Sequence, residues 1–140
     1  MLYLASDHAG FILKEEVKNR LLKSNIEFVD LTSKFNEGDD YPDSAKILAQ
    51  KIGSNDSLGL AFCGTGTGIC IALNRFRQIR AVTTLNVDVL KLAREHNNAN
   101  VLCLPGRFVV LEEAFKMVQI FLNTSFDPNL RHIRRIEKMS

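Results

Sequence analysis

Short apolar segments alternate five times with longer stretches whose apolar residues recur at helical spacing, and this alternation constrains the fold more than any other feature. The apolar segments are residues 2–5, 26–31, 58–62, 80–83 and 100–104. Strands that alternate with helices usually form one parallel sheet with helices packed on both of its faces. The sequence therefore predicts an α/β, Rossmann-like three-layer fold with a five-stranded parallel sheet.

The intervening stretches are recognised as helices because their apolar residues lie three or four positions apart. In the first of them Leu13, Val17 and Leu21 repeat every fourth residue, and the helix is expected to end near Ser24. Pro42 suits the first turn of the next helix. The later stripes are Ala45, Leu48, Ala49 and Ile52; Ile69, Ala72, Leu73 and Phe76; Val89, Leu92, Ala93 and His96; Val110, Ala114, Met117 and Phe121; and Leu130, Ile133, Ile136 and Met139.

No linker or repeat divides the chain, so we expect a single domain over residues 1–140. Its C-terminal helix is expected at about 128–139, with Asp127 as its cap and Pro128 in its first turn. The 140 residues are 46% hydrophobic and 24% charged, which is ordinary for a globular domain. No apolar run approaches the roughly 18–20 residues of a membrane span, and the N-terminus lacks the regions of a signal peptide. We therefore expect a cytoplasmic protein that does not bind membranes.

The charges are spread unevenly, although the formal net charge is only +2. The last predicted helix holds four cations against one acid, Glu137, and the four are Arg131, Arg134, Arg135 and Lys138. The rest of the chain is close to neutral, so a general nucleic-acid surface is not expected. The basic stripe itself has three readings: a solvated face, a nucleic-acid contact or a phosphate clamp.

The three cysteines, Cys63, Cys70 and Cys103, are odd in number and lack CxxC spacing. The cysteines are therefore expected to be free thiols, and neither a disulfide framework nor a cysteine zinc site is predicted. The three histidines form no HExxH motif, so no metal site is predicted. Cys70 and Cys103 lie on apolar segments and are expected in the core.

The strongest local motif is the run Cys63-Gly64-Thr65-Gly66-Thr67-Gly68, which directly follows the third predicted strand. Alternating glycines let the backbone turn sharply, and the start of a helix directs amide N–H groups outward. Such a turn can hold an anion or an oxyanion, or it can be a tight connection without a ligand. The run does not match three familiar loops. Ile69 stands where a P-loop needs lysine and where a cysteine phosphatase loop needs arginine. The third glycine comes one residue too early for a dinucleotide-binding GxGxxG motif.

Cys63 lies between the strand and the glycine turn, where the start of a helix favours the thiolate. A thiolate there can serve as a base or a nucleophile, whereas the alternative is an inert buried cysteine. Asp7 and His8 follow the first strand and could bind polar substrate groups or form a loop salt link. His96 and Asn97 end a predicted helix, and His96 could equally be a packed histidine.

Together these motifs resemble the ribose-5-phosphate isomerase B family, in the sugar-phosphate isomerase group that also includes galactose-6-phosphate and allose-6-phosphate isomerases. The resemblance covers nearly the whole chain. It rests on residues 6–10, 13–14, 40–42, 63–69, 96–97, 100–101 and 106–107, with Arg131, His132 and Arg135. It implies a metal-free, cofactor-free aldose–ketose isomerase that interconverts ribose 5-phosphate and ribulose 5-phosphate through an enediolate.

The resemblance also implies a role for each matching residue. Cys63 is the catalytic base, Thr65 and Asp7 assist with hydroxyl contacts and proton handling, and His96 helps to open the furanose ring. The implied substrate-binding residues are His8, Tyr41, Gly64, Gly66, Thr67, Gly68, Asn97, Arg107, Arg131 and Arg135. Of these, His8, Arg131 and Arg135 hold the phosphate together with Arg107 from a partner subunit. The family works as a homodimer or a dimer of dimers, with each site built from two chains.

The sequence leaves two alternatives open. The first is the same chemistry on a six-carbon substrate, because the polar loop over residues 32–40 does not indicate sugar length. The second is a non-catalytic sugar-phosphate-binding subunit, which would keep the glycine turn and the arginines without needing Cys63. Some relatives use a glutamate at the position of Ile69, so a chain with Cys63 and without that glutamate resembles the cysteine-base type.

Overall fold

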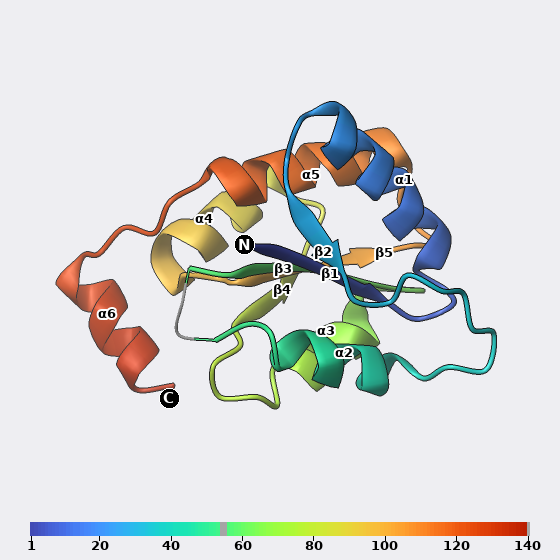
Figure 1. Ribbon diagram of the computed structural model, residues 1–140. Coiled ribbons are helices and arrows are strands. Elements are labelled where there is room, and N and C mark those ends of the chain that lie inside the picture. The colour runs from blue at the N-terminus through green and yellow to red at the C-terminus, as the bar shows by residue number, and fades with distance from the viewer. Residues whose placement is uncertain (54–55, 140) are drawn as a thin grey trace.

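The chain forms three layers, with a parallel sheet between two layers of helices (Figure 1). The computed structural model describes residues 1–53 and 56–139. The strands are β1 (Leu2–Ser6), β2 (Phe28–Asp30), β3 (Leu58–Cys63), β4 (Ala81–Thr83) and β5 (Val101–Pro105). They lie in the order β2-β1-β3-β5-β4, and all neighbouring pairs are parallel. The predicted α/β three-layer architecture with a five-stranded sheet is confirmed.

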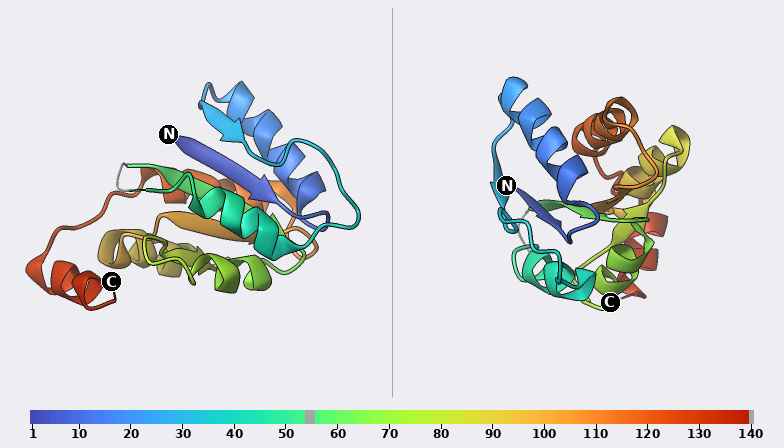
Figure 2. Two further views of the ribbon diagram at one scale, coloured as in Figure 1. Left: turned by 60° about the horizontal axis from the view of Figure 1, so that its bottom comes forward. Right: turned by 90° about the vertical axis from the view of Figure 1, so that its right-hand side faces the viewer.

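The helices divide between the two faces of the sheet (Figure 2). Helices α1 (Phe11–Lys23), α4 (Val87–Asn97) and α5 (Leu111–Asn123) pack side by side on one face. Helices α2 (Tyr41–Ala49) and α3 (Thr67–Leu73) cover the other face, and α6 (Leu130–Glu137) lies against α4. Within the described residues, no helix is both long and apolar enough to cross a bilayer.

Alternation along the strands produces one core on each side of the sheet, because successive side chains point to opposite faces. Leu4 and Leu60 are fully buried against α1 and α5, in a cluster that also holds Phe121. Ala5 and Ala61 face the other way, toward α2 and α3. Cys63, Cys70 and Cys103 are free and buried on that second side, as expected for the last two.

The apolar stripe predicted for α4 coincides only in part with the face that the fold buries. Val89 and Leu92 are 50% and 47% exposed, whereas Leu90, Ala93 and Arg94 are buried. Arg94 is buried because its guanidinium donates hydrogen bonds to the carbonyls of Thr124 and Ala99. The spacing of apolar residues cannot predict that Arg94 is buried, since a search for apolar periodicity counts every arginine as exposed.

The predicted start of the last helix is also wrong, by two residues. Asn129 is the cap, and its side chain accepts a hydrogen bond of 3.1 Å from the amide of Arg131. Asp127 instead anchors the preceding segment, since its amide donates to the carbonyl of Glu95 at 2.9 Å. Asp and Asn cap helices about equally well, so the sequence alone could not choose between them. Val110, predicted to line α5, likewise lies just before that helix and is exposed.

The topology makes the carboxyl ends of β1 and β3 the expected place for a ligand. The chain leaves β1 into α1 on one face and leaves β3 into α3 on the opposite face. In open parallel sheets, ligands bind where neighbouring strands diverge in this way.

Candidate active site

The loops that follow β1, β3 and β5 are joined into one compact unit. The amide of Asp7 donates to the carbonyl of Phe62 at 3.2 Å, and that of Gly106 donates to the carbonyl of Cys63 at 2.8 Å. Gly10 must be glycine, because an added Cβ would lie 2.3 Å from the backbone carbon of Phe62. Contacts this close fix the three loops relative to one another.

The glycine run after β3 forms the sharp turn that the sequence predicts. Gly66 has a φ of 73°, a left-handed conformation that favours glycine. The amide of Thr67 donates to Thr65 Oγ1 at 3.2 Å, so this donor is already used within the turn. Cys63 is the last residue of β3, and the residue is only 3% exposed.

Asp7 and His8 occupy the loop between β1 and α1. Asp7 is buried, and its Oδ1 accepts a hydrogen bond of 2.9 Å from the amide of Gly10. His8 is partly exposed, and its Nδ1 lies 2.9 Å from Oδ1 of Asp39. The hydrogen bond to Asp39 raises the pKa of His8 despite some desolvation, with a further contribution from the charge of Asp7. The imidazolium, which suits an anionic ligand, is thereby favoured.

Tyr41 and Arg107 lie against the glycine turn from two sides. A Cβ added to Gly68 would be 2.8 Å from Cζ of Tyr41, and one added to Gly64 would be 3.2 Å from Nη1 of Arg107. The amide of Arg107 also donates to the carbonyl of Gly64 at 3.0 Å. The resemblance implies that Arg107 comes from a partner subunit, whereas here the chain's own Arg107 lies beside its own glycine turn.

These residues form what we call the carboxyl-edge half-site, at the carboxyl ends of β1, β3 and β5. It contains Asp7, His8, Tyr41, Cys63, Gly64, Thr65, Gly66, Thr67, Gly68 and Arg107. No group of three His, Cys, Asp or Glu side chains suited to a metal occurs among residues 1–53 and 56–139.

The remaining predicted residues gather where α4 meets α6. The ring of His96 stacks on that of His132, with centroids 4.2 Å apart. Arg131 Nε donates to Nε2 of His132 at 3.1 Å, so the ring proton of the neutral His132 is on Nδ1, which lies 3.2 Å from the carbonyl oxygen of Asp127. Buried His132 thus joins the two helices and orients Arg131.

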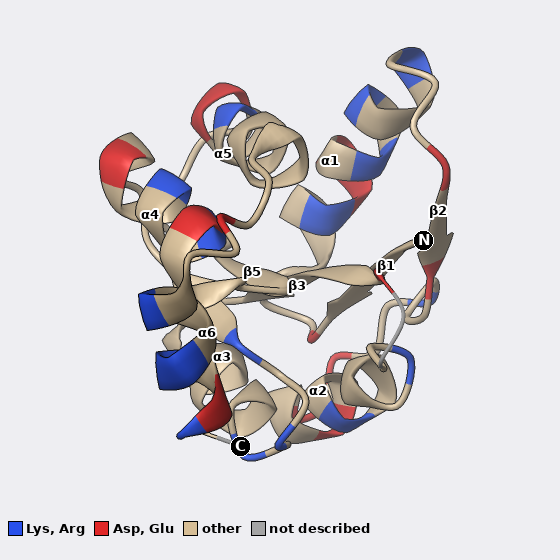
Figure 3. Cartoon of the chain, turned by 90° about the vertical axis from the view of Figure 1, so that its left-hand side faces the viewer, with Lys and Arg blue, Asp and Glu red and all other residues tan. Residues whose placement is uncertain are grey.

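Arg131 and Arg135 lie four residues apart on α6, so their side chains share one face of the helix. Figure 3 marks the Lys and Arg positions of α6 in blue. In the described part of the chain, neither guanidinium has a carboxylate within 4.0 Å, which leaves both charges available to an external anion. Asn97 lines a cavity of about 370 Å³ beside them, together with Ile136 and Met139. We call His96, Asn97, Arg131 and Arg135 the α4–α6 half-site.

The two half-sites lie at opposite ends of the sheet. Helix α4 ends just before β5, and the carbonyl of Asn100 there accepts a hydrogen bond from the amide of Gly59, near the start of β3. Cys63 ends the same six-residue strand. A strand of that length places its two ends roughly 15–20 Å apart. Figure 1 shows α6 at the end of the molecule away from the loops that follow β1 and β3. One chain therefore does not bring its own His96, Asn97, Arg131 and Arg135 to Cys63.

The sequence pattern does not single out Asp39 and assigns no role to His132. In the structure Asp39 holds His8 in place and His132 orients Arg131. Asp39 lies in a polar loop with no pattern that distinguishes it from its acidic neighbours. His132 is among the residues that carry the resemblance, but nothing in the sequence indicates what its ring contacts.

The whole chain is similar to isomerases of sugar phosphates. The family described as Ribose/Galactose Isomerase matches residues 2–139. Probable ribose-5-phosphate isomerase B of Mycoplasma pneumoniae is 43% identical, over 99% of this chain and 91% of that protein. Ribose-5-phosphate isomerase B of Escherichia coli is 38% identical, over 96% of this chain and 90% of that protein.

Solved structures agree with these matches. A ribose 5-phosphate isomerase from Thermotoga maritima superposes with a TM-score of 0.93 at 52% identity, covering 99% of this chain and 95% of that one. Ribose-5-phosphate isomerase B from Mycoplasma genitalium, solved with bound ribulose-5-phosphate, has a TM-score of 0.90 at 41% identity, with 99% and 92% covered. The fold, the order of the motifs and the sequence similarity over nearly the whole length agree. The chain belongs to the ribose/galactose isomerase family.

Proposed function

We propose that this protein interconverts ribose 5-phosphate and ribulose 5-phosphate, with Cys63 as the base. The observation that carries the proposal is the carboxyl-edge half-site, where a thiol at the end of β3 adjoins a glycine turn flanked by Arg107 and Tyr41. Full-length similarity to proteins named ribose-5-phosphate isomerase B, one of them solved with ribulose-5-phosphate, supports the substrate.

The reaction needs a base because hydrogen on a carbon next to a carbonyl is only weakly acidic. The Cys63 thiolate takes the proton from C2 of the open-chain aldose, and the electron pair moves toward O1 to form an enediolate. The same thiol then returns a proton to C1, while a proton moves between O1 and O2, and the ketose results. Thr65 and Asp7 are assigned to that oxygen-to-oxygen transfer. Cys103 is unsuited to be the base, since burial raises its pKa and keeps the thiol protonated.

The glycine turn is assigned to the developing enediolate oxygen. A fixed N–H donor aimed at such an oxygen typically lowers a barrier by about 3–4 kcal/mol. The amide of Thr67 donates to Thr65 within the turn, so the other amides from Gly64 to Gly68 are the candidates for this role.

A complete site is proposed to form between two copies of the chain. The carboxyl-edge half-site of one copy would face the α4–α6 half-site of the other. His96, assigned to ring opening, and Asn97, assigned to contacts with the sugar, would then lie near the Cys63 thiol of the other copy. Exposed apolar side chains flank both halves, with Phe108 70% exposed beside Arg107 and Leu130 83% exposed on α6. Apolar surface in these places favours a second copy covering it.

The phosphate of the substrate is assigned to cations from both halves. His8 and Arg107 belong to the carboxyl-edge half-site, whereas Arg131 and Arg135 would reach it from the second copy. The phosphate is remote from C1 and C2, so its binding energy can be used to position the reacting carbons.

The direct test is turnover of ribose 5-phosphate by the purified protein in EDTA, compared with turnover of allose 6-phosphate and galactose 6-phosphate. We expect the pentose phosphate to be converted fastest and without added metal. A preference for a hexose phosphate would move the assignment to the six-carbon alternative. Absence of turnover on all three by folded protein would refute the proposed activity and favour a non-catalytic binding subunit.

A further inference from the structure

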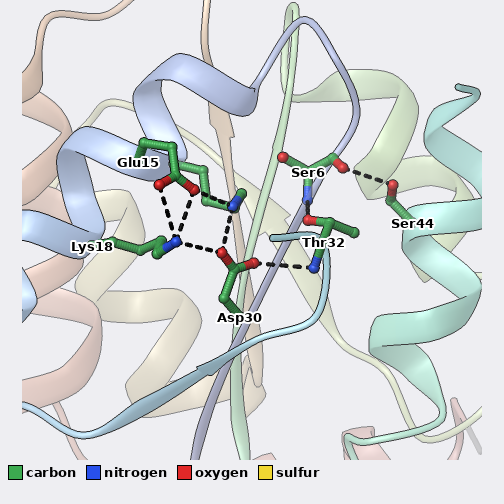
Figure 4. A network of polar contacts seen from close by, with 7 residues as sticks. Ser6, Glu15, Lys18, Asp30, Thr32 and Ser44 are labelled. Carbon is green, nitrogen blue, oxygen red and sulfur yellow. Dashed lines mark hydrogen bonds and ion pairs between the residues drawn. The ribbon is translucent and has the colours of Figure 1, made fainter. Parts of the chain in front are cut away.

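The loop between β2 and α2 contacts the end of β1 at its beginning. Thr32 Oγ1 accepts a hydrogen bond of 2.8 Å from the amide of Ser6, and the amide of Thr32 donates to Oδ1 of Asp30 at 3.0 Å (Figure 4). On the other side of β1, the hydroxyl of Ser44 donates to the carbonyl of Ser6 at 2.8 Å. Ser6 is the residue before Asp7 and His8, so these bonds fix the start of the loop against the candidate site.

A buried ion network holds this end of the loop in place. Oδ2 of Asp30 accepts from Nζ of Lys14 at 2.7 Å and from Nζ of Lys18 at 2.6 Å (Figure 4). The side chain of Lys14 is 0% exposed, and Glu15 pairs with both lysines. Removing one partner would leave a buried charge uncompensated, so the network strongly favours this one arrangement.

The far end of the loop contacts His8 directly. Oδ1 of Asp39 accepts a hydrogen bond of 2.8 Å from the amide of His8 and lies 2.9 Å from its Nδ1. A carboxylate can only accept, so Nδ1 must carry a proton. The two ring nitrogens lie on different sides of the imidazole, and Nε2 is therefore turned away from Asp39.

We propose that Asp39 is a positioning residue that orients His8 toward the phosphate of the substrate. The loop over residues 31–40 holds Asp39 in the place where it contacts His8. The inference rests on the proposed function, in which His8 contacts that phosphate. Both ends of the loop hold the same three-residue segment, Ser6 to His8, so the loop determines how that segment is presented.

Asp39 also affects the charge of His8. The hydrogen bond that His8 donates to Asp39 is the main cause that raises the pKa of His8, desolvation opposes it, and the carboxylate of Asp7 adds to it. Asp39 and Asp7 are the charged groups that act on this imidazole. A larger fraction of His8 is therefore protonated near neutral pH than an isolated histidine would be, which strengthens its hydrogen bond to a phosphate oxygen.

The test compares Asp39→Asn with Asp39→Ala. Asn keeps an acceptor for the amide of His8 but removes the charge, whereas Ala removes both. We expect the pKa of His8, followed by NMR titration of its ring protons, to fall in both variants. We expect KM for ribose 5-phosphate to rise roughly 3- to 10-fold above pH 7, more in Ala than in Asn, while kcat changes little. The KM–pH profile should move to lower pH with the pKa.

Asp43→Asn is the matched control, because it removes the same charge from an exposed position at the start of α2, close in sequence. It should leave the pKa of His8 and the kinetics unchanged. An unchanged pKa of His8 in Asp39→Asn would overturn the inference, and this outcome does not depend on any activity measurement. A His8→Ala variant separates the remaining outcomes. If it raises KM and the Asp39 variants do not, the positioning role alone fails. If it leaves KM unchanged, the phosphate role of His8 fails and the inference with it.

Discussion

The two half-sites are built in opposite ways. The carboxyl-edge half-site lies where three strands end, and backbone hydrogen bonds join its loops to one another and to the glycine turn. The α4–α6 half-site stands on a short helix that packs on α4 and is oriented largely through the buried ring of His132. The first half is held together by contacts within one chain, whereas the second is the surface that we propose to meet a second copy.

This difference matches what each half is proposed to do. Proton transfer at C1 and C2 needs donors and a base held within fractions of an ångström, and a loop cluster locked by β1, β3 and β5 can supply that precision. Phosphate binding by Arg131 and Arg135 tolerates more movement, because long cationic side chains adapt to an anion. The division therefore places the demanding chemistry where the backbone is best constrained.

The largest expected effect is on the chemistry of the carboxyl-edge half-site. Cys63→Ala should lower kcat for ribose 5-phosphate by about 10² or more, since a positioned base contributes that much. Cys70→Ala is the matched control, because it removes a neighbouring buried thiol that has no assigned role. Equal activity of the Cys63 and Cys70 variants in a steady-state assay would show that Cys63 is not the base.

The second prediction tests whether the two halves meet across copies. Cys63→Ala and His96→Ala should each be nearly inactive alone, yet co-refolded in equal amounts they should regain about a quarter of wild-type activity. Half of a random mixture is heterodimer, and each heterodimer carries one site with both halves intact. Activity that stays at the level of the single variants would place the complete site within one chain.

A smaller effect is expected in the α4–α6 half-site. Arg135→Ala should raise KM roughly 10- to 30-fold and change kcat little, because it removes a charge-assisted contact to the phosphate rather than to the reacting carbons. Arg134→Ala on the same helix provides a comparison of equal charge. A proportional loss in kcat instead would indicate that Arg135 acts in the transition state.

The smallest effect on catalysis is expected from Asp30, whose carboxylate contributes to stability at acid pH. Burial acts to raise the pKa of Asp30, but hydrogen bonds from Lys14 and Lys18 outweigh it and the pKa is lowered. The stability contributed by this carboxylate is therefore present above its unfolded pKa, near 3.8, and is lost as pH falls through the folded value. Urea unfolding at pH 7, 4 and 3 should show a decline that Asp30→Asn reduces. An identical decline in the variant would assign acid sensitivity to other carboxylates.

Asp30→Asn should also destabilise the protein at pH 7, by roughly 2–4 kcal/mol, since Lys14 would keep only Glu15 as a carboxylate partner. Because Asp30 supports the loop over residues 31–40, the variant should disturb His8 as well. His96 should be unaffected, which NMR shifts of the two rings can report.

The sequence by itself determined the architecture and the composition of the carboxyl-edge half-site. Alternating apolar segments specify strands and helices through local periodicity, and a glycine run after a strand has few conformations available. The carboxyl ends of parallel strands lie at the same end of the sheet, so Asp7, His8 and Cys63 could be expected near one another without knowledge of any contact. The position of this chain's own Arg107 beside its own glycine turn was not expected, because the resemblance implies an Arg107 from a partner subunit.

Only the tertiary structure decided which residues support the site and where its other half lies. Asp39 is one of several acids in a loop, and its selection by His8 depends on a backbone path that no local pattern encodes. Helix α4 ends just before β5, so His96 and Asn97 lie at the amino ends of the strands, whereas Asp7 and Cys63 lie at the carboxyl ends. Long-range geometry arises from packing of the whole chain, and motifs read along the sequence carry no information about distance across it.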